Sequence, residues 1–148
     1  MSDYKDKTRV RSCGILIKNE CILLAQLLSP ISNELIWTPP GGGVKFGETL
    51  EAALKREFFE ETGLTISVNK LAHINEIIQD RFHAIEFFFL VNYESGNLKL
   101  GSDPEHNEKN QILKALSFMR KDEIIGLNVQ PEYLKKEFWI DYPSFLKS

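Results

Sequence analysis

Three glutamates, Glu57, Glu60 and Glu61, stand close together in one short stretch of the chain. The stretch predicts a helix from about Thr49 to Thr62, followed by Gly63, the residue type that favours the position just past a helix C-terminus. Residues three and four apart share one face of a helix, so their carboxylates would repel one another. A divalent cation would reverse the sign of that interaction, and oxygen ligands at this spacing suit Mg²⁺ or Mn²⁺.

The same face of the predicted helix begins with apolar residues. Leu50, Ala53 and Leu54 form a surface to be buried, and the glutamates take the positions where a packing helix would carry Leu or Ile. Surface glutamates on a solvated face are the alternative interpretation, and a Glu-x-x-Glu-Glu pattern alone does not decide between the two. The residues around the helix favour the metal site.

The chain from Gly42 to Leu64 resembles the signature of the Nudix hydrolase family at every specified position. Gly42 is followed after five residues by Glu48, and after seven more by the run REFFEETGL of residues 56–64. The preceding residues 37–41, WTPPG, are also similar to the family's approach to this signature. Fixed positions over such a length are a more specific signal than three glutamates alone.

This resemblance implies a single Nudix hydrolase domain over residues 1–148, an α/β fold of the Nudix-type α/β/α sandwich with a mixed β-sheet. It implies metal-dependent hydrolysis of a diphosphate bond in a nucleoside diphosphate linked to another group, of the nucleoside triphosphate, ADP-ribose or nucleotide-sugar type. Bound Mg²⁺ or Mn²⁺ would neutralise phosphate oxygens and lower the pKa of a bound water. The implied metal ligands are Glu57, Glu60, Glu61 and the backbone carbonyl of Gly42.

The resemblance implies that Arg56 and Glu48 orient the metal-binding glutamates, because the corresponding residues of the family hold those glutamates in position. A simple ion pair is the alternative for Arg56, which stands four residues before Glu60. The run Gly41–Gly43 would let bare backbone approach phosphate or metal, but a tight strand-to-helix turn would use the same residues.

The candidate substrate-binding residues lie in and before this glycine run. They are Trp37, Gly41, Gly43, Lys45 and Phe46. Trp37 and Phe46, with Tyr93 further on, are candidates to stack on a base, although the first two could equally pack the turn. Some subfamilies that hydrolyse ADP-ribose or diadenosine polyphosphates carry a proline or tyrosine downstream of the signature. Residues 79–82 contain neither, which weakens those two assignments.

The general base is left open by the sequence. Some relatives use a glutamate of the signature, and others use an acidic residue of a distant loop. Glu105 and Glu108 lie in such a loop, and His83 and His106 are further candidates. Each of these four is also consistent with a solvated loop residue.

The sequence disfavours two other functions. A catalytically silent Nudix-fold nucleotide-binding or sensor module is disfavoured because no residue of the signature is missing. Removal of messenger-RNA caps is disfavoured because the net charge is −3 and no basic patch is expected from the sequence. We therefore expect a small-molecule nucleotide partner, no nucleic acid and no membrane, while a homodimer is one state that the sequence leaves open.

The composition and the N-terminus predict a cytoplasmic protein. Residues 1–10 are polar and lack the apolar core of a signal peptide, and residues 1–8 are expected to form a flexible tail. Cys13 and Cys21 lie on the two arms of a predicted hairpin. Its turn at residues 19–20 would place Cys13 opposite Gln26, so no disulfide is expected.

Strands dominate the predicted elements, with one central and one C-terminal helix. Periodicity and turn residues predict strands over residues 10–18, 21–28, 35–37, 64–68, 70–79, 83–93 and 111–118, and helices over 121–125 and 131–140. The strand 83–93 is rich in phenylalanine and is expected to be central in the sheet. In the last helix, the apolar residues Tyr133, Leu134, Phe138 and Trp139 are expected to dock on the sheet.

Overall fold

The computed structural model describes residues 6–29, 31–101 and 113–142. Within these ranges, seven strands form one mixed sheet in the order β3-β2-β1-β6-β5, with β4 paired to β1 and β7 paired to β2. The elements are β1 (Thr8–Lys18), β2 (Cys21–Leu28), β3 (Leu35–Thr38), β4 (Gly41–Gly43), α1 (Leu50–Thr62), β5 (Leu64–Gln79), β6 (Phe82–Gly96), β7 (Leu113–Arg120), α2 (Lys121–Ile125), the 3₁₀ helix η3 (Glu132–Lys135) and α3 (Glu137–Asp141).

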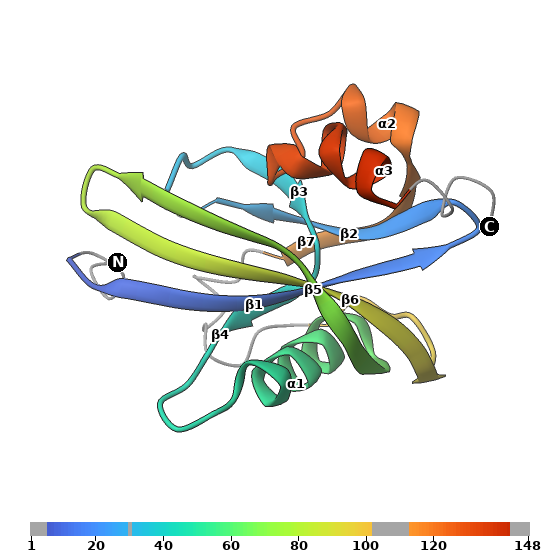
Figure 1. The fold of residues 1–148 in the computed structure, drawn as a ribbon, viewed down its shortest axis with the longest axis horizontal. Coiled ribbons are helices and arrows are strands. Elements are labelled where there is room, and N and C mark those ends of the chain that lie inside the picture. Colours follow the sequence, from blue (N-terminus) through green and yellow to red (C-terminus); the bar gives the residue numbers. More distant parts are fainter. Residues whose placement is uncertain (1–5, 30, 102–112, 143–148) are drawn as a thin grey trace.

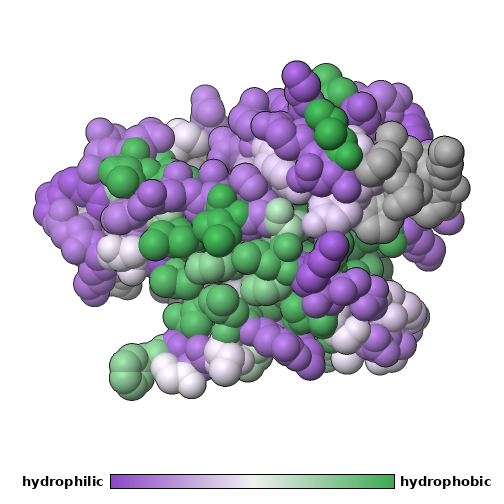
Figure 2. Space-filling model, viewed as in Figure 1, coloured by the Kyte–Doolittle hydropathy of each residue, from purple (hydrophilic) through white to green (hydrophobic). Residues whose placement is uncertain are grey.

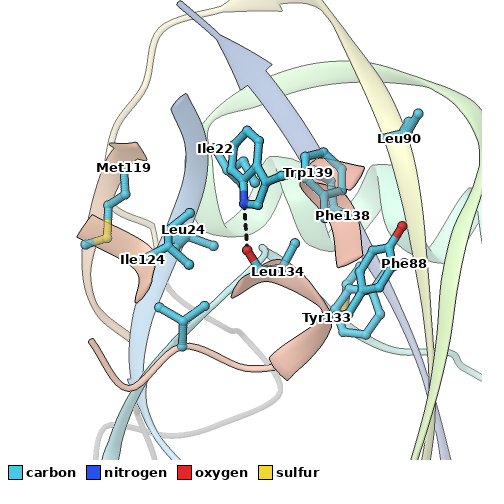
Figure 3. Packing of buried hydrophobic residues seen from close by; sticks show 13 residues of the cluster. Ile22, Leu24, Phe88, Leu90, Met119, Ile124, Tyr133, Leu134, Phe138 and Trp139 are labelled. Atoms are coloured by element: carbon cyan, nitrogen blue, oxygen red, sulfur yellow. Dashed lines mark hydrogen bonds between the residues drawn. The ribbon is translucent and has the colours of Figure 1, made fainter. Parts of the chain in front are cut away.

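Helices lie on both faces of the strands, which confirms the predicted sandwich (Figure 1). The helix α1 covers one face, where Leu54 and Phe58 join a buried cluster with Leu16 and Leu23. The C-terminal elements α2, η3 and α3 cover the other face and enclose a larger cluster (Figure 3). The apolar faces of the sheet and helices therefore bury each other in two layers, as a sheet of this kind requires.

The hairpin of β1 and β2 forms at the predicted turn. Asn19 and Glu20 both adopt positive φ, 52° and 65°, as a two-residue hairpin turn demands. The β1–β2 ladder covers only the two residue pairs nearest the turn, because β1 then runs beside β6 and β4. The expected position of Cys13 opposite Gln26 is therefore wrong, since Cys13 lies opposite Gly41. Both cysteines are free, as expected.

The central strands are longer than predicted. The two strands predicted over residues 64–68 and 70–79 are one continuous strand, β5, which pairs along its length with β6. Irregular register near Val68 and Leu71 absorbs the changes in alternation that suggested a break. As predicted, β6 is internal, between β1 and β5. The outer strand β5 exposes Ile74 and Ile78, and Figure 2 shows apolar side chains gathered across the middle of this view.

The C-terminal region differs from the single helix predicted over residues 131–140. The backbone leaves helical geometry at Lys136, with φ −145° and ψ −64°, which separates η3 from α3. The break lets both segments turn apolar side chains inward, so the four predicted docking residues are all buried. In Figure 3 the indole N–H of Trp139 donates to the carbonyl of Leu134, at 2.8 Å.

The N-terminal strand starts earlier than predicted. Thr8 is already the first residue of β1, within the range predicted as a tail, and the backbone N–H of Asp6 donates to the carbonyl of Arg81 at 2.8 Å. In the described residues no helix has both the length and the apolar character needed to span a membrane.

Candidate active site

The helix α1 has the ends that the sequence predicts. The hydroxyl of Thr49 accepts a hydrogen bond from the N–H of Ala52, at 3.0 Å, and so caps the N-terminus. Gly63 adopts the left-handed conformation, with φ 77°, and its N–H donates to the carbonyl of Phe59. These two ends fix the start and the length of the helix, and with them which turns carry the glutamates.

The run Gly41–Gly43 is a strand, β4, and not the predicted loop or turn. It pairs antiparallel with β1, with Gly42 opposite Ser12. A Cβ atom on Gly42 would lie 2.4 Å from Cδ of Glu57, and one on Gly41 would lie 2.3 Å from the carbonyl oxygen of Ser12. Only glycine therefore lets β4 lie this close to β1 and to the carboxylate of α1.

The ladder also sets the direction of the glycine carbonyls. Gly14 donates to the carbonyl of Pro40, and Val44 donates to that of Val10. In the same register Ser12 lies opposite Gly42, two residues away from each of these bonded pairs. Every second residue pair of an antiparallel ladder is hydrogen-bonded, so the Gly42 carbonyl faces β1. By the same alternation, the carbonyls of residues 41 and 43 face the opposite edge of β4, where the N–H of residue 41 donates to Glu61 Oε1 at 3.2 Å.

Arg56 connects the helix to this edge. Its Nε and Nη2 donate to the two carboxylate oxygens of Glu48, at 2.8 and 2.9 Å, and its Nη1 donates to Glu57 at 2.8 Å. Its Nη2 also donates to the carbonyl of Gly43, at 3.2 Å. The contact with Glu60, at 3.4 Å, is the longest of the set. The simple ion pair with Glu60 is therefore a minor part of what Arg56 does.

The hydrogen bonds of this network favour the charged forms of Glu48 and Arg56. The hydrogen bonds from Arg56, together with one from the backbone of Lys45, lower the pKa of Glu48 to about 2. The hydrogen bond to Glu48, followed by that to Glu57, raises the pKa of Arg56 above its usual range. Glu48 and Arg56 are therefore both ionised at neutral pH.

The three glutamates differ in their access to solvent. Glu57 is 1% exposed and Glu61 7%, whereas the side chain of Glu60 is 24% exposed. Across residues 6–29, 31–101 and 113–142, no three acidic, histidine or cysteine side chains converge as a ready-made metal site. The carboxylates instead turn toward Arg56 and the backbone of β4. As a donor set, three carboxylates beside outward-facing backbone carbonyls fit a hard divalent cation.

The predicted substrate-binding residues separate into two groups. Trp37 lies in β3, half-buried against the C-terminal core cluster, and its backbone bonds to Asn128, so its ring packs the fold. Lys45 and Phe46 lie in the exposed β4–α1 connection, and Phe46 is fully exposed, which excludes a packing role for its ring. Residues 7–10 and 43–48 line an open groove of about 490 Å³ beside them.

The candidates for the general base are only partly described. Glu105, His106 and Glu108 lie outside the described residues. His83, at the start of β6, has its Nε2 2.8 Å from Glu76 and its Nδ1 3.4 Å from the hydroxyl of Thr8. These contacts are on the strands and do not involve the glutamates of α1.

Sequence reasoning missed two arginines of β1. Arg11 forms an ion pair with Glu86, whose other carboxylate oxygen accepts from Asn75 at 3.1 Å. Arg9 lies two residues before it, and a Cβ on Gly43 would be 3.3 Å from Arg9 Nη2. The signal was in the sequence, since alternate residues of a strand share one face and the strand begins TRVRS.

The chain is similar to known proteins in its family model, in its sequence and in its fold. The family model described as NUDIX domain matches residues 8–138. The chain is 35% identical over 98 residues to the ADP-ribose pyrophosphatase of Methanocaldococcus jannaschii, covering 64% of this chain and 57% of that protein. It is 38% identical over 72 residues to the NAD-capped RNA hydrolase NudC of Haemophilus influenzae, covering 49% of this chain and 26% of that protein. The chain thus spans little more than half of the first relative and about a quarter of the second.

Among solved structures, the fold is similar to the crystal structure of a MutT protein from Methanosarcina mazei Go1. The TM-score is 0.71 at 21% identity, and the match covers 97% of this chain and 98% of that chain. At this identity the similarity establishes the fold.

Proposed function

The chain belongs to the NUDIX domain family, and from this membership we propose that it is a metal-dependent hydrolase of a diphosphate bond in a nucleoside diphosphate linked to another group. The observation that carries the proposal is the network of Arg56, which gathers Glu48, Glu57 and Glu60 beside the glycine strand β4. A structural role alone would not require three carboxylates around one arginine on a half-buried helix.

Members of the family generally use a divalent metal, and we propose Mg²⁺ or Mn²⁺ here. Glu57, Glu60 and Glu61 would hold it, and the direction of the β4 carbonyls supports Gly41 as the backbone ligand in place of the expected Gly42. When bound, the metal would neutralise phosphate oxygens and make a bound water more acidic.

The residues of the chain itself position these groups. The two hydrogen bonds from Arg56 to Glu48 anchor the guanidinium, so Arg56 would keep its position if Glu57 and Glu60 were to bind a cation. The absence of side chains on β4 lets a diphosphate lie against its backbone. Gly41, Gly43, Lys45 and Phe46 form the proposed substrate side, in which Lys45 would offer a positive charge and Phe46 an exposed aromatic ring.

For its setting, we propose a cytoplasmic protein with one Nudix domain over residues 1–148 that acts on a small nucleotide, with neither nucleic acid nor membrane as a partner. The exposed apolar residues of the outer strand β5 leave a homodimer open. Sedimentation at several protein concentrations tests that state.

The test is hydrolysis of a panel of nucleoside triphosphates, ADP-ribose, nucleotide sugars and dinucleoside polyphosphates, with Mg²⁺ and then with EDTA. Glu60→Gln and Glu61→Gln are expected to keep the fold and to lower turnover by orders of magnitude. Glu51→Gln is the matched control, because Glu51 lies on the exposed side of the same helix, where it pairs with Lys55. Unchanged turnover in both site variants would contradict the proposal. Nucleotide binding without any product would favour the sensor module.

A further inference from the structure

The groove beside β4 has two walls of different origin. One wall is formed by Lys7 and by Arg9 at the start of β1, and the other is the β4–α1 connection, with Lys45 and Phe46. The groove is open to solvent and has a volume of about 490 Å³. Its volume is within the range of small-molecule sites, and its exposure to solvent is compatible with a charged, hydrated group.

Among the described residues that line the groove, basic side chains outnumber acidic ones, although the protein as a whole is acidic. Lys7, Arg9 and Lys45 contribute three positive charges, and Glu48 is the one acidic residue. Glu48 is already bonded through both carboxylate oxygens to Arg56, so its charge is compensated from outside the groove. The chain as a whole carries a net charge of −3, so cations are gathered here against the general balance.

One residue separates this groove from the carboxylates of α1. The guanidinium of Arg9 lies over the Cα of Gly43, where a Cβ would be 3.3 Å from Nη2 and 3.5 Å from Nε. The carbonyl of the same glycine accepts from Arg56, which holds Glu57 and Glu60. A ligand with its diphosphate at the carboxylates can therefore reach Arg9 across bare backbone.

We propose that this groove, which is lined by Lys7, Arg9 and Lys45, binds a phosphate group beyond the diphosphate that is cleaved. The inference rests on the proposed function and names the substrate class within it. Substrates that carry a further phosphate, such as nucleoside triphosphates, are bound here, whereas the uncharged sugar of ADP-ribose or of a nucleotide sugar gains nothing from the three cations. Arg9 is thus a residue that determines specificity.

The first experiment compares two substrates in one variant. Arg9→Gln is expected to lower kcat/KM for a nucleoside triphosphate about tenfold to a hundredfold, mainly through KM, and to change kcat/KM for ADP-ribose much less. Lys45→Gln, at an exposed position that no core contact requires, is expected to act in the same direction. Arg9→Lys restores part of the loss. An unchanged ratio of the two kcat/KM values in both glutamine variants overturns the proposal.

The second experiment does not depend on hydrolysis, so it separates this inference from the proposed function. Calorimetry of the intact protein with inorganic tripolyphosphate, in EDTA, is expected to give binding that weakens about tenfold or more in Arg9→Gln. Arg120→Gln is the control, because Arg120 lies beside α2 and pairs with Asp122. Equal tripolyphosphate affinity in the wild type and Arg9→Gln overturns the subsite even in a protein that hydrolyses the panel. If nothing in the panel is hydrolysed, the loss in Arg9→Gln alone still supports it.

Discussion

At the scale of single residues, the site depends on the absence of a side chain at Gly42. Gly42 has no Cβ, and the carboxylate of Glu57 takes the space where that atom would lie. Glu57 is 1% exposed and bonds to Arg56 from this position. The glycine therefore sets the position of a carboxylate fifteen residues later in the chain, which helix geometry alone would leave free to point elsewhere.

Gly42→Ala tests this contact. The new Cβ would lie 2.4 Å from Cδ of Glu57, so either the carboxylate or β4 must move. We expect metal-dependent turnover to fall at least about tenfold, since small misplacements at an active site cost this much. We expect unfolding in urea to occur at lower concentration. Gly126→Ala is the control, because its Cβ would meet nothing closer than 3.8 Å. Normal turnover in Gly42→Ala would contradict the positioning role.

Glu48 makes a pH-dependent contribution to stability. Its pKa falls from an ordinary 4.5 to about 2 in the folded protein, chiefly because Arg56 donates to it. A carboxyl whose pKa is lowered by folding stabilises the protein above pH 4.5 and loses that contribution as the pH falls toward 2. The wild type should therefore be more stable than Glu48→Gln at neutral pH, and the difference should shrink on acidification. Urea unfolding of both proteins at a series of pH values measures it, and a difference that is constant down to pH 2 would contradict the assignment.

At the scale of elements, the site is a junction of one helix and one short strand. The cap of α1 at Thr49 and its left-handed end at Gly63 fix the turns on which Arg56 and the glutamates stand. The strand β4 is held by its ladder to β1 and presents its other edge to those turns. The two elements are joined by residues 44–49, so one wall of the groove and the helix that carries the glutamates belong to one continuous segment of the chain.

Thr49→Ala removes the cap of α1. The N–H of Ala52 loses its acceptor, and we expect a loss of about 1 kcal/mol in the free energy of unfolding, the usual cost of losing such a cap. Thr49→Ser keeps the hydroxyl and should lose much less. Chemical denaturation of the three proteins measures the differences, and equal stability of the alanine and serine variants would show that the cap does not contribute.

At the scale of the whole molecule, the two buried clusters hold the sheet from both faces and leave the carboxylates at its margin. In the described structure, Arg56 carries much of the compensation for their charge. A cation that binds the folded protein and not the unfolded chain adds stability by mass action. The metal is thus expected to affect the unfolding temperature even when no substrate is present.

Addition of Mg²⁺ to the metal-free protein should raise the melting temperature in a concentration-dependent way. A concentration one hundred times the dissociation constant adds about 2.7 kcal/mol. The rise should be smaller in Glu60→Gln and unchanged in Glu51→Gln, at constant ionic strength. Differential scanning calorimetry measures it. An equal rise in Glu60→Gln and in the wild type would exclude Glu60 as a ligand.

The features that the sequence alone determined are local. The turn at Asn19 and Glu20, the cap at Thr49 and the end at Gly63 each depend on the conformational preference of one or two residues and their immediate neighbours. The family signature is local in the same sense, because its residues share one glycine run and one helix. Candidate site residues could therefore be proposed, and the layered α/β fold correctly expected, without coordinates.

The tertiary structure decided what depends on partners distant in sequence. Gly41–Gly43 became a strand because β1 supplies its ladder, and the direction of the Gly42 carbonyl follows from that pairing. Cys13 lies opposite Gly41 and not opposite Gln26, because this part of β1 pairs with β4 and β6 and not with β2. Arg9 approaches Gly43 for the same reason. The hydrogen-bond register depends on which strands lie side by side, and no pattern within a single segment contains that information.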